Sequence, residues 1–450
     1  MKRIIRLIPS FLLVFGLSGL SGYCAAGALF TSTLTTESVQ KIVGQSGWVI
    51  IDTRLSDAFN GWKLDGVARG GHLSGAVDFS ANWLRVDDEG VGEILQQALD
   101  TKGIRRPLSV LLYDANGKDA QAVASYLRAQ GYEKLYYYNV RPWAEDGELP
   151  LETLPNFHRI VPAAIVKAVI DGERPETFGQ AKSVKIVEAS WGDADKSYSK
   201  GHIPTAYHIN TDSIEPLRKI LPPMWMLASD EELLRIAREY GLTHNDTVIV
   251  TAEEPLAAYR VASVLEYLGV ADVRILNGGH QAWVMAGYAL ETQERKPIPV
   301  SDFGLSQPLR PDVIDTLDEV KKKIGGSEPF VLVDNRTREE FLGETSGYTY
   351  YLKRGRIPGA VYGYAGYEDS YSMDVFRNAD NTMRNPEEWL GLWKQQGIDI
   401  NKSLSFMCGS GWRAAEVYFY ADVAGIDRIS IFSDGWIGWS NAGLPTIAGE

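Results

Sequence analysis

The chain repeats one pattern three times, and this repeat constrains the fold more than any other feature. In each copy a Gly ends a polar helical segment, and an apolar strand ends eleven residues after that Gly. A second helical segment then ends at another Gly, seventeen residues after the strand end. The three strand ends are Asp114, Ala252 and Cys408. Equal spacings in three places indicate three copies of one structural unit.

Each unit alternates short apolar runs with helix-length segments, which is typical of an α/β fold with a mostly parallel sheet. Upstream of each strand end lies another apolar run, WVIIDTR at 48–54, VKIVEAS at 184–190 and FVLVDNR at 330–336. Related turns follow these runs, with the sequences GHLSGA, GHIPTA and GRIPGA. We therefore predict three tandem domains, each a doubly wound, mostly parallel sheet flanked by helices.

Proline-rich segments set the domain boundaries, because such segments act as spacers rather than core. ELPLETLP separates the first two units, and a segment with four prolines at 291–312 separates the second from the third. The predicted domains are 34–156, 157–295 and 305–450.

The first residues are typical of an export signal. Lys2, Arg3 and Arg6 precede an apolar run at 7–20, which is too short to span a bilayer comfortably, and small residues follow up to Ala28. We predict a signal peptide at 1–28, an exported protein, and no stable membrane span after the signal is removed. Two alternatives stay open: lipidation of Cys24, which the preceding Tyr fits poorly, and retention of the segment as an anchor.

Composition limits the chemistry. Lys and Arg total 45 and Asp and Glu total 58, a net charge of −13, which argues against nucleic-acid partners. The six His show no Cys and His cluster at metal-ligand spacing, so we predict no metal. Only Cys24 and Cys408 are present, and removal of the signal leaves Cys408 alone. An intrachain disulfide is therefore excluded in the exported form.

The third strand end differs from the other two because it alone carries a nucleophile. Cys408 stands at the carboxyl end of a parallel strand, before a helix, where ligands bind in open α/β sheets and where the helix dipole favours a thiolate. Gly409 and Gly411 let backbone amides surround an anion on the sulfur. Arg413 adds a guanidinium suited to oxyanions. The third unit contains no His, so the pattern favours a thiolate stabilised by amides and charge over a Cys–His pair.

At this point the sequence resembles the rhodanese (sulfurtransferase) family, and most closely its three-domain periplasmic thiosulfate sulfurtransferases. The resemblance is carried by DNR, GRIPGA, SFMCGSGWRAAE and SDGWIGWSNAGLP, and it covers nearly all of the mature chain. It implies a periplasmic enzyme that moves sulfane sulfur from thiosulfate, through a persulfide on Cys408, to cyanide or a thiol, with no organic cofactor. Domains 1 and 2 would be inactive copies, and domain 1 a candidate site for recruiting an acceptor protein.

The resemblance also implies the binding residues. Arg336, in the D-x-R position, would contact the anionic donor, beside the loop residues Gly409, Ser410, Gly411, Trp412 and Arg413. The CGSG sequence is similar to that of mercaptopyruvate sulfurtransferases, where the Ser works with a His and an Asp. Asp212 is a candidate match, but Met224 and Trp225 stand where a His would be needed, unless His208 replaces it. Mercaptopyruvate is therefore the second donor, behind thiosulfate.

Two other classes of function compete with sulfur transfer. A phosphatase would need five residues between its Cys and Arg, and this loop has four between Cys408 and Arg413. A binding or redox-sensing protein is the other rival, because two of the three units already lack the nucleophile. The intact loop of the third unit favours catalysis.

Overall fold

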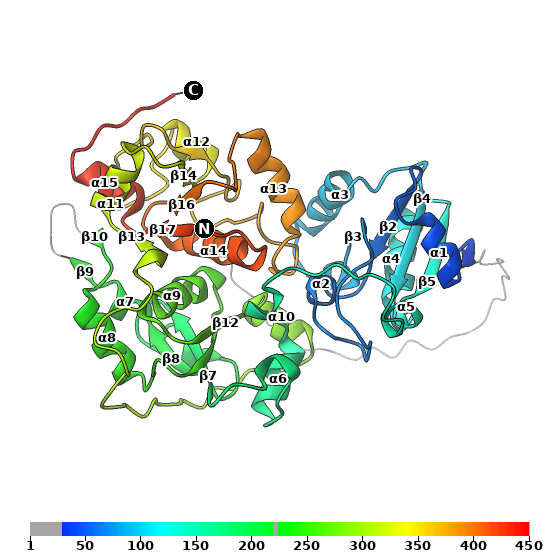
Figure 1. The fold of residues 1–450 in the computed structure, drawn as a ribbon, viewed down its shortest axis with the longest axis horizontal. Coiled ribbons are helices and arrows are strands. Elements are labelled where there is room, and N and C mark those ends of the chain that lie inside the picture. The colour runs from blue at the N-terminus through cyan, green and yellow to red at the C-terminus, as the bar shows by residue number, and fades with distance from the viewer. Residues whose placement is uncertain (1–28, 219–223, 450) are drawn as a thin grey trace, which may run out of the picture.

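The protein consists of three α/β domains that follow one another along the chain (Figure 1). The computed structural model describes residues 29–218 and 224–449. The predicted signal peptide, with Cys24, lies outside the described residues. Domain 1 is blue to cyan, domain 2 green, and domain 3 yellow to red in Figure 1.

Domain 1 contains a five-stranded sheet of order β1-β5-β4-β2-β3, in which every pair is parallel. Its central strands are buried on both faces, as expected for a sheet covered by helices on each side. The strands are β1 Ser32–Thr33, β2 Trp48–Asp52, β3 Val77–Asp78, β4 Ser109–Asp114 and β5 Leu135–Asn139. The helices are α1 Thr36–Ile42, α2 Ser56–Asn60, α3 Val91–Thr101, α4 Lys118–Ala129 and α5 Arg141–Glu145. Strand β1 begins just ahead of the predicted domain boundary.

Domain 2 repeats this topology in a second five-stranded parallel sheet, β6-β12-β11-β7-β8, and adds a small antiparallel pair, β9 and β10. The strands are β6 Ile160–Val161, β7 Val184–Ser190, β8 Tyr207–Asn210, β9 Leu217–Arg218, β10 Met224–Trp225, β11 Thr247–Thr251 and β12 Asp272–Leu276. The helices are α6 Ala163–Ile170, α7 Thr211–Ile214, α8 Asp230–Glu239, α9 Pro255–Leu268 and α10 Gly279–Met285.

Domain 3 has the same order again, β13-β17-β16-β14-β15. The strands are β13 Ile314–Asp315, β14 Phe330–Asp334, β15 Val361–Tyr362, β16 Ser403–Met407 and β17 Ile429–Phe432. The helices are α11 Leu317–Ile324, α12 Arg338–Leu342, α13 Pro386–Gln395, α14 Trp412–Val423 and α15 Gly435–Asn441. Three identical strand orders confirm the predicted fold class.

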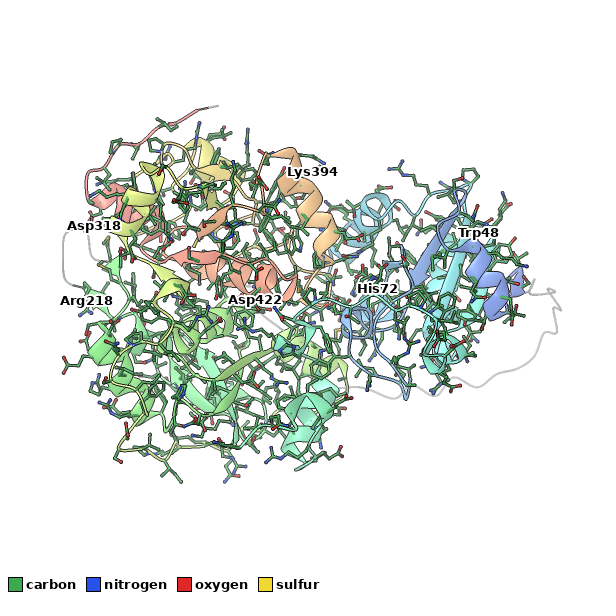
Figure 2. All side chains as sticks on the ribbon, in the orientation of Figure 1. Trp48, His72, Arg218, Asp318, Lys394 and Asp422 are labelled. Atoms are coloured by element: carbon green, nitrogen blue, oxygen red, sulfur yellow. The ribbon has the colours of Figure 1, made fainter. Side chains whose placement is uncertain are left out.

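Domains 2 and 3 share one hydrophobic core, because α9 of domain 2 packs against α14 of domain 3. The Tyr259 hydroxyl donates to the Tyr420 hydroxyl at 2.9 Å across this contact. Asp422, labelled in Figure 2 where α14 meets domain 2, forms an ion pair with Arg159 at 2.5 Å. Helix α14, which follows Cys408, is thus held against domain 2, which contains no cysteine.

Domain 1 has its own core and touches both other domains at their junction. The indole of Trp62 donates to the Ile160 carbonyl of domain 2 at 2.8 Å. The amide of Asn82 donates to Asp380 of domain 3 at 2.9 Å. Among the helices of the described residues, none is both long and apolar enough to cross a membrane.

Candidate active site

The loop from Cys408 to Gly411 joins β16 to α14 at the carboxyl edge of the domain 3 sheet. Gly411 caps α14 with a φ of +88°, a left-handed conformation that favours glycine. The Cys408 carbonyl accepts from the Trp436 N–H at 2.8 Å, and the Gly409 carbonyl accepts from the Ile437 N–H at 3.0 Å. In a trans peptide the N–H points opposite to the C=O, so these bonds turn the following N–H groups away from α15.

Within the described chain, the N–H groups from Gly409 to Ala414 have no hydrogen-bond acceptor. Cys408 is a free thiol with 1% of its surface exposed. A sulfur anion on this side chain would therefore meet unoccupied donors and the positive end of the α14 dipole.

Domain 1 shows what the same loop binds when the cysteine is absent. Asp114 stands at the position of Cys408, and its carboxylate accepts from the N–H groups of Asn116, Gly117 and Ala120 at 3.1, 2.7 and 2.9 Å. The Tyr137 hydroxyl adds a fourth bond at 3.1 Å. In this fold the loop is an anion cradle, filled in domain 1 by the chain's own carboxylate and open in domain 3.

Arg413 lies beneath the loop rather than in solvent. It is 1% exposed and forms two hydrogen bonds to Glu340, at 2.7 and 2.9 Å, and one to the Tyr348 hydroxyl at 3.0 Å. Burial by itself would raise the pKa of Glu340, but Arg413 and Arg336 overcome this and hold the pKa below its usual range. The predicted contact of Arg413 with the donor therefore competes with a buried carboxylate.

Tyr348 is a site residue that the sequence did not reveal. A Cβ added to Gly409 would lie 1.9 Å from the Tyr348 hydroxyl oxygen, so the hydroxyl is packed directly against the loop. Burial raises the pKa of Tyr348, so the hydroxyl keeps its proton at neutral pH. Because the oxygen accepts from Arg413, the hydrogen is available to donate to another group.

Arg336 is fully buried, and its guanidinium binds Asp334 at 2.9 and 2.7 Å and the Gly355 carbonyl at 2.9 Å. Domain 1 contains the same arrangement in the pair of Arg54 and Asp52. The D-x-R pairing thus holds the strand end to the following turn, with or without a cysteine. The Nη1 atom of Arg336 has no hydrogen-bond partner among the described residues. The predicted contact of Arg336 with the anionic sulfur donor would use the hydrogens on this atom.

Ser410 and Trp412 face domain 2. Ser410 lines an opening together with Met224 and Trp225, the two residues that stand in the sequence where a relay would need a His. None of the described residues lining this opening is a His. His208 instead bonds to Ser190 at 2.7 Å, and Asp212 is exposed, so neither bonds to Ser410.

Exposed aromatic rings surround the loop. Trp191 of domain 2 stacks on Trp412 with centroids 5.0 Å apart, and Trp225 of domain 2 meets Tyr350 of domain 3 edge-on at 5.4 Å. Trp191 also lies 6.4 Å from Tyr371. Sequence reasoning named Trp412 and Trp225 but missed Trp191, Tyr350 and Tyr371, because these rings come from separate segments of two domains.

Two buried groups of domain 2 were also missed, Arg260 and Glu215. Arg260 occurs within the mostly apolar helix sequence PLAAYRVASVLEYL, and a charged residue between apolar neighbours in such a helix is a signal that could have found it. For metals, the described residues contain no group of three or more His, Cys, Asp or Glu that could hold an ion.

A thiol in an open amide cradle, at the strand edge of tandem α/β domains, defines the class of enzymes that carry a group on cysteine sulfur. The Rhodanese-like domain model matches residues 35–140, 177–286 and 316–442. The chain belongs to the rhodanese family, and it is a sulfurtransferase.

Relatives span the whole chain. The chain is 33% identical over 452 residues to the thiosulfate sulfurtransferase YnjE of Escherichia coli K12, covering 100% of this chain and 98% of YnjE. It also resembles the anaerobic ergothioneine biosynthesis enzyme from Chlorobium limicola in complex with trimethyl histidine. That match has a TM-score of 0.84 at 33% identity and covers 93% of this chain and 99% of the other. An EanB variant with a cysteine persulfide and ergothioneine matches with a TM-score of 0.85 at 33% identity, over 93% of this chain and 100% of its own.

Proposed function

We propose that the protein transfers sulfane sulfur from thiosulfate through a persulfide on Cys408. The Cys408 thiolate attacks the outer sulfur of thiosulfate, the S–S bond of thiosulfate breaks, and sulfite leaves with the bonding pair. The Cys408 persulfide anion then gives its terminal sulfur to cyanide, forming thiocyanate, or to a thiol, and the thiolate returns. Each step conserves charge and needs no proton, so one nucleophile suffices.

The observation that carries the proposal is the occupied cradle of domain 1. The Asp114 carboxylate accepts from two loop N–H groups and from one N–H in the first turn of α4, so an anion is stabilised at this position. The terminal sulfur of a persulfide on Cys408 is such an anion. It would meet the equivalent N–H groups of Ser410, Gly411 and Ala414, fixed in place before the reaction.

Thiosulfate is favoured over mercaptopyruvate by the residues around Ser410. Mercaptopyruvate yields an enolate that must gain a proton, and the opening beside Ser410 is lined by Met224 and Trp225. Sulfite needs no proton to leave. The kcat/KM values for the two donors, measured side by side, test this choice.

The central test is the replacement Cys408→Ser. We expect it to abolish sulfur transfer from thiosulfate to cyanide, together with the mass of one added sulfur on the intact protein after incubation with thiosulfate. The circular dichroism spectrum should stay unchanged, because Ser fits the volume of the buried Cys. Retention of either the activity or the added mass would contradict the proposal.

A second acceptor class is favoured by the aromatic rings around the loop. Exposed indole and phenol faces attract cations, and quaternary ammonium groups above all. The structural relatives include complexes with trimethyl histidine and ergothioneine. Incubation of the persulfide form with trimethyl histidine, compared with cyanide and a thiol, tests this acceptor by mass spectrometry of the small-molecule product.

We also propose that the enzyme acts after export, in the periplasm. The charged and apolar pattern of residues 1–28 supports this location. Detection of a mature N-terminus near residue 29 in a periplasmic fraction tests it.

A redox-sensing role, the rival to sulfur transfer, would predict a mixed disulfide on Cys408 and no turnover.

A further inference from the structure

Domain 2 lacks a cysteine, yet it places a buried ion pair directly against the catalytic loop of domain 3. Arg260 of α9 is fully buried, and its Nε donates to Glu215 at 2.8 Å. A second bond to Glu215 comes from Arg260 Nη2. Burying two charges is costly unless further hydrogen bonds satisfy them, so this pair calls for additional partners.

Those partners belong to domain 3, on both sides of the loop. The indole N–H of Trp412, the residue after the loop, donates to Glu215 Oε2 at 2.5 Å. Arg260 Nη2 donates to the Ser433 hydroxyl at 2.5 Å. The pair therefore links the start of α14 to the turn before α15, and it does so from the neighbouring domain.

The turn at Ser433 in turn fixes the catalytic loop. A Cβ added to Gly435 would lie 2.5 Å from the Cys408 carbonyl oxygen, so the turn and the loop are in close backbone contact. Arg260 Nη1, which has no described hydrogen-bond partner, lies 3.2 Å from where a Cβ of Gly411 would be. The guanidinium is thus aimed at the backbone of the loop itself.

We propose that Arg260 and Glu215 are positioning residues for the Cys408 loop, and that this is the function retained by domain 2. The inference rests on the proposed sulfur transfer for its kinetic readout. By fixing Trp412 and Ser433, the pair keeps the loop N–H groups pointing at the sulfur. A cradle displaced by about 1 Å loses one to two orders of magnitude in rate, although the fold survives.

The test compares Arg260→Met and Glu215→Gln with Arg274→Met. Arg274 is the matched control, since it is a buried arginine of domain 2 that pairs with Asp272 at 2.8 Å and does not contact domain 3 in any described bond. We expect Arg260→Met and Glu215→Gln to lower kcat by about tenfold or more, with KM for thiosulfate changed by less than about threefold. Arg274→Met should lower the melting temperature and leave kcat unchanged. Arg260→Lys should recover part of kcat, because it restores the charge.

A second readout does not depend on the donor. This readout is the pH dependence of the rate at which iodoacetamide alkylates Cys408, followed by peptide mapping. The midpoint of this pH profile should shift in Arg260→Met and in Glu215→Gln. It should stay unchanged in Arg274→Met. A shifted profile in a protein that takes no sulfur from thiosulfate would keep the positioning role and refute the proposed function.

Wild-type kcat and a wild-type alkylation profile in folded Arg260→Met would overturn the positioning role. An equal loss of kcat in Arg274→Met would also overturn it, because general loosening of domain 2 would then suffice. If Arg260→Met fails to fold, the nearly isosteric Glu215→Gln decides by the same criteria.

Discussion

Tyr348 illustrates, at the scale of a single residue, how a half-buried phenol can stabilise a sulfur anion. Its oxygen accepts a hydrogen bond from Arg413, and it lies against Gly409 of the loop. The bond from a buried cation polarises the hydroxyl and strengthens its own donation. Since burial raises the pKa of Tyr348, the group acts as a neutral donor and not as a base.

We predict that Tyr348→Phe lowers kcat for sulfur transfer by about tenfold or more, because loss of a hydrogen bond to a charged group costs about 1.5–3 kcal/mol. Tyr351→Phe is the control, because the Tyr351 hydroxyl forms its hydrogen bond at 2.8 Å with Ser440, a residue of α15 and not of the Cys408 loop. Steady-state kinetics on both variants provide the measurement. Equal kcat values for wild type and Tyr348→Phe would remove the hydroxyl from the mechanism.

At the scale of secondary structure, the repeated unit separates scaffold from chemistry. The strand ends of β2 and β14 each pair an Asp with an Arg two residues later, and the Arg also binds the carbonyl of a distant Gly, Gly71 in domain 1 and Gly355 in domain 3. These hydrogen bonds connect the end of each strand to the turn that contains Gly71 or Gly355. Domains 1 and 3 therefore contain the same Asp–Arg pair at a strand end, and only domain 3 also contains a cysteine.

We predict that Arg54→Met and Arg336→Met destabilise their domains by similar amounts, about 3–5 kcal/mol each, because both leave a buried carboxylate unpaired. Urea unfolding measures this loss. If Arg336 also contacts the donor, Arg336→Met alone raises KM for thiosulfate under conditions where both variants are folded. Unchanged KM in Arg336→Met would confine the residue to the scaffold.

At the scale of the whole molecule, the three domains meet around buried carboxylates. Asp57 of domain 1 accepts from the Asn277 amide of domain 2 at 2.8 Å, and Asp380 of domain 3 lies nearby. Burial raises the pKa of Asp57 to about 7, and the charge of Asp380 adds to the shift, while the Asn277 bond opposes it. Burial raises the pKa of Asp380 as well. In the folded protein Asp57 therefore keeps a proton at pH values at which the unfolded chain would release it.

The sign of the pH effect follows from this proton. Between about pH 4 and pH 7 the unfolded chain has lost the Asp57 proton and the folded chain still holds it, so stability falls as pH rises and levels off above pH 7. We predict a loss of about 4 kcal/mol at most across this window. Asp57→Asn, which mimics the protonated form, should flatten the profile. Urea unfolding at pH 5 and pH 8 measures it, and a variant with the wild-type slope would contradict the assignment.

The sequence by itself determined the repeated architecture and indicated Cys408 as the candidate nucleophile. Equal spacings around Asp114, Ala252 and Cys408 are properties of the chain, because helix and strand lengths follow from local apolar patterns and glycine positions. The three identical strand orders agree with three copies of one unit. The loop residues Gly409 and Gly411 were likewise readable, since a tight turn before a helix restricts which residue types can occupy it.

Only the tertiary structure decided how charge is distributed at the site. Sequence could count Arg336 and Arg413 as cations, but each is neutralised by a buried carboxylate, Asp334 or Glu340. Tyr348 and Arg260 reach the loop from a distant segment and from another domain. Contacts of this kind depend on how separate elements pack, and no local pattern encodes packing between elements far apart in the chain. The candidate nucleophile could therefore be identified from the sequence, whereas the contacts around it were set by the meeting of domains 2 and 3.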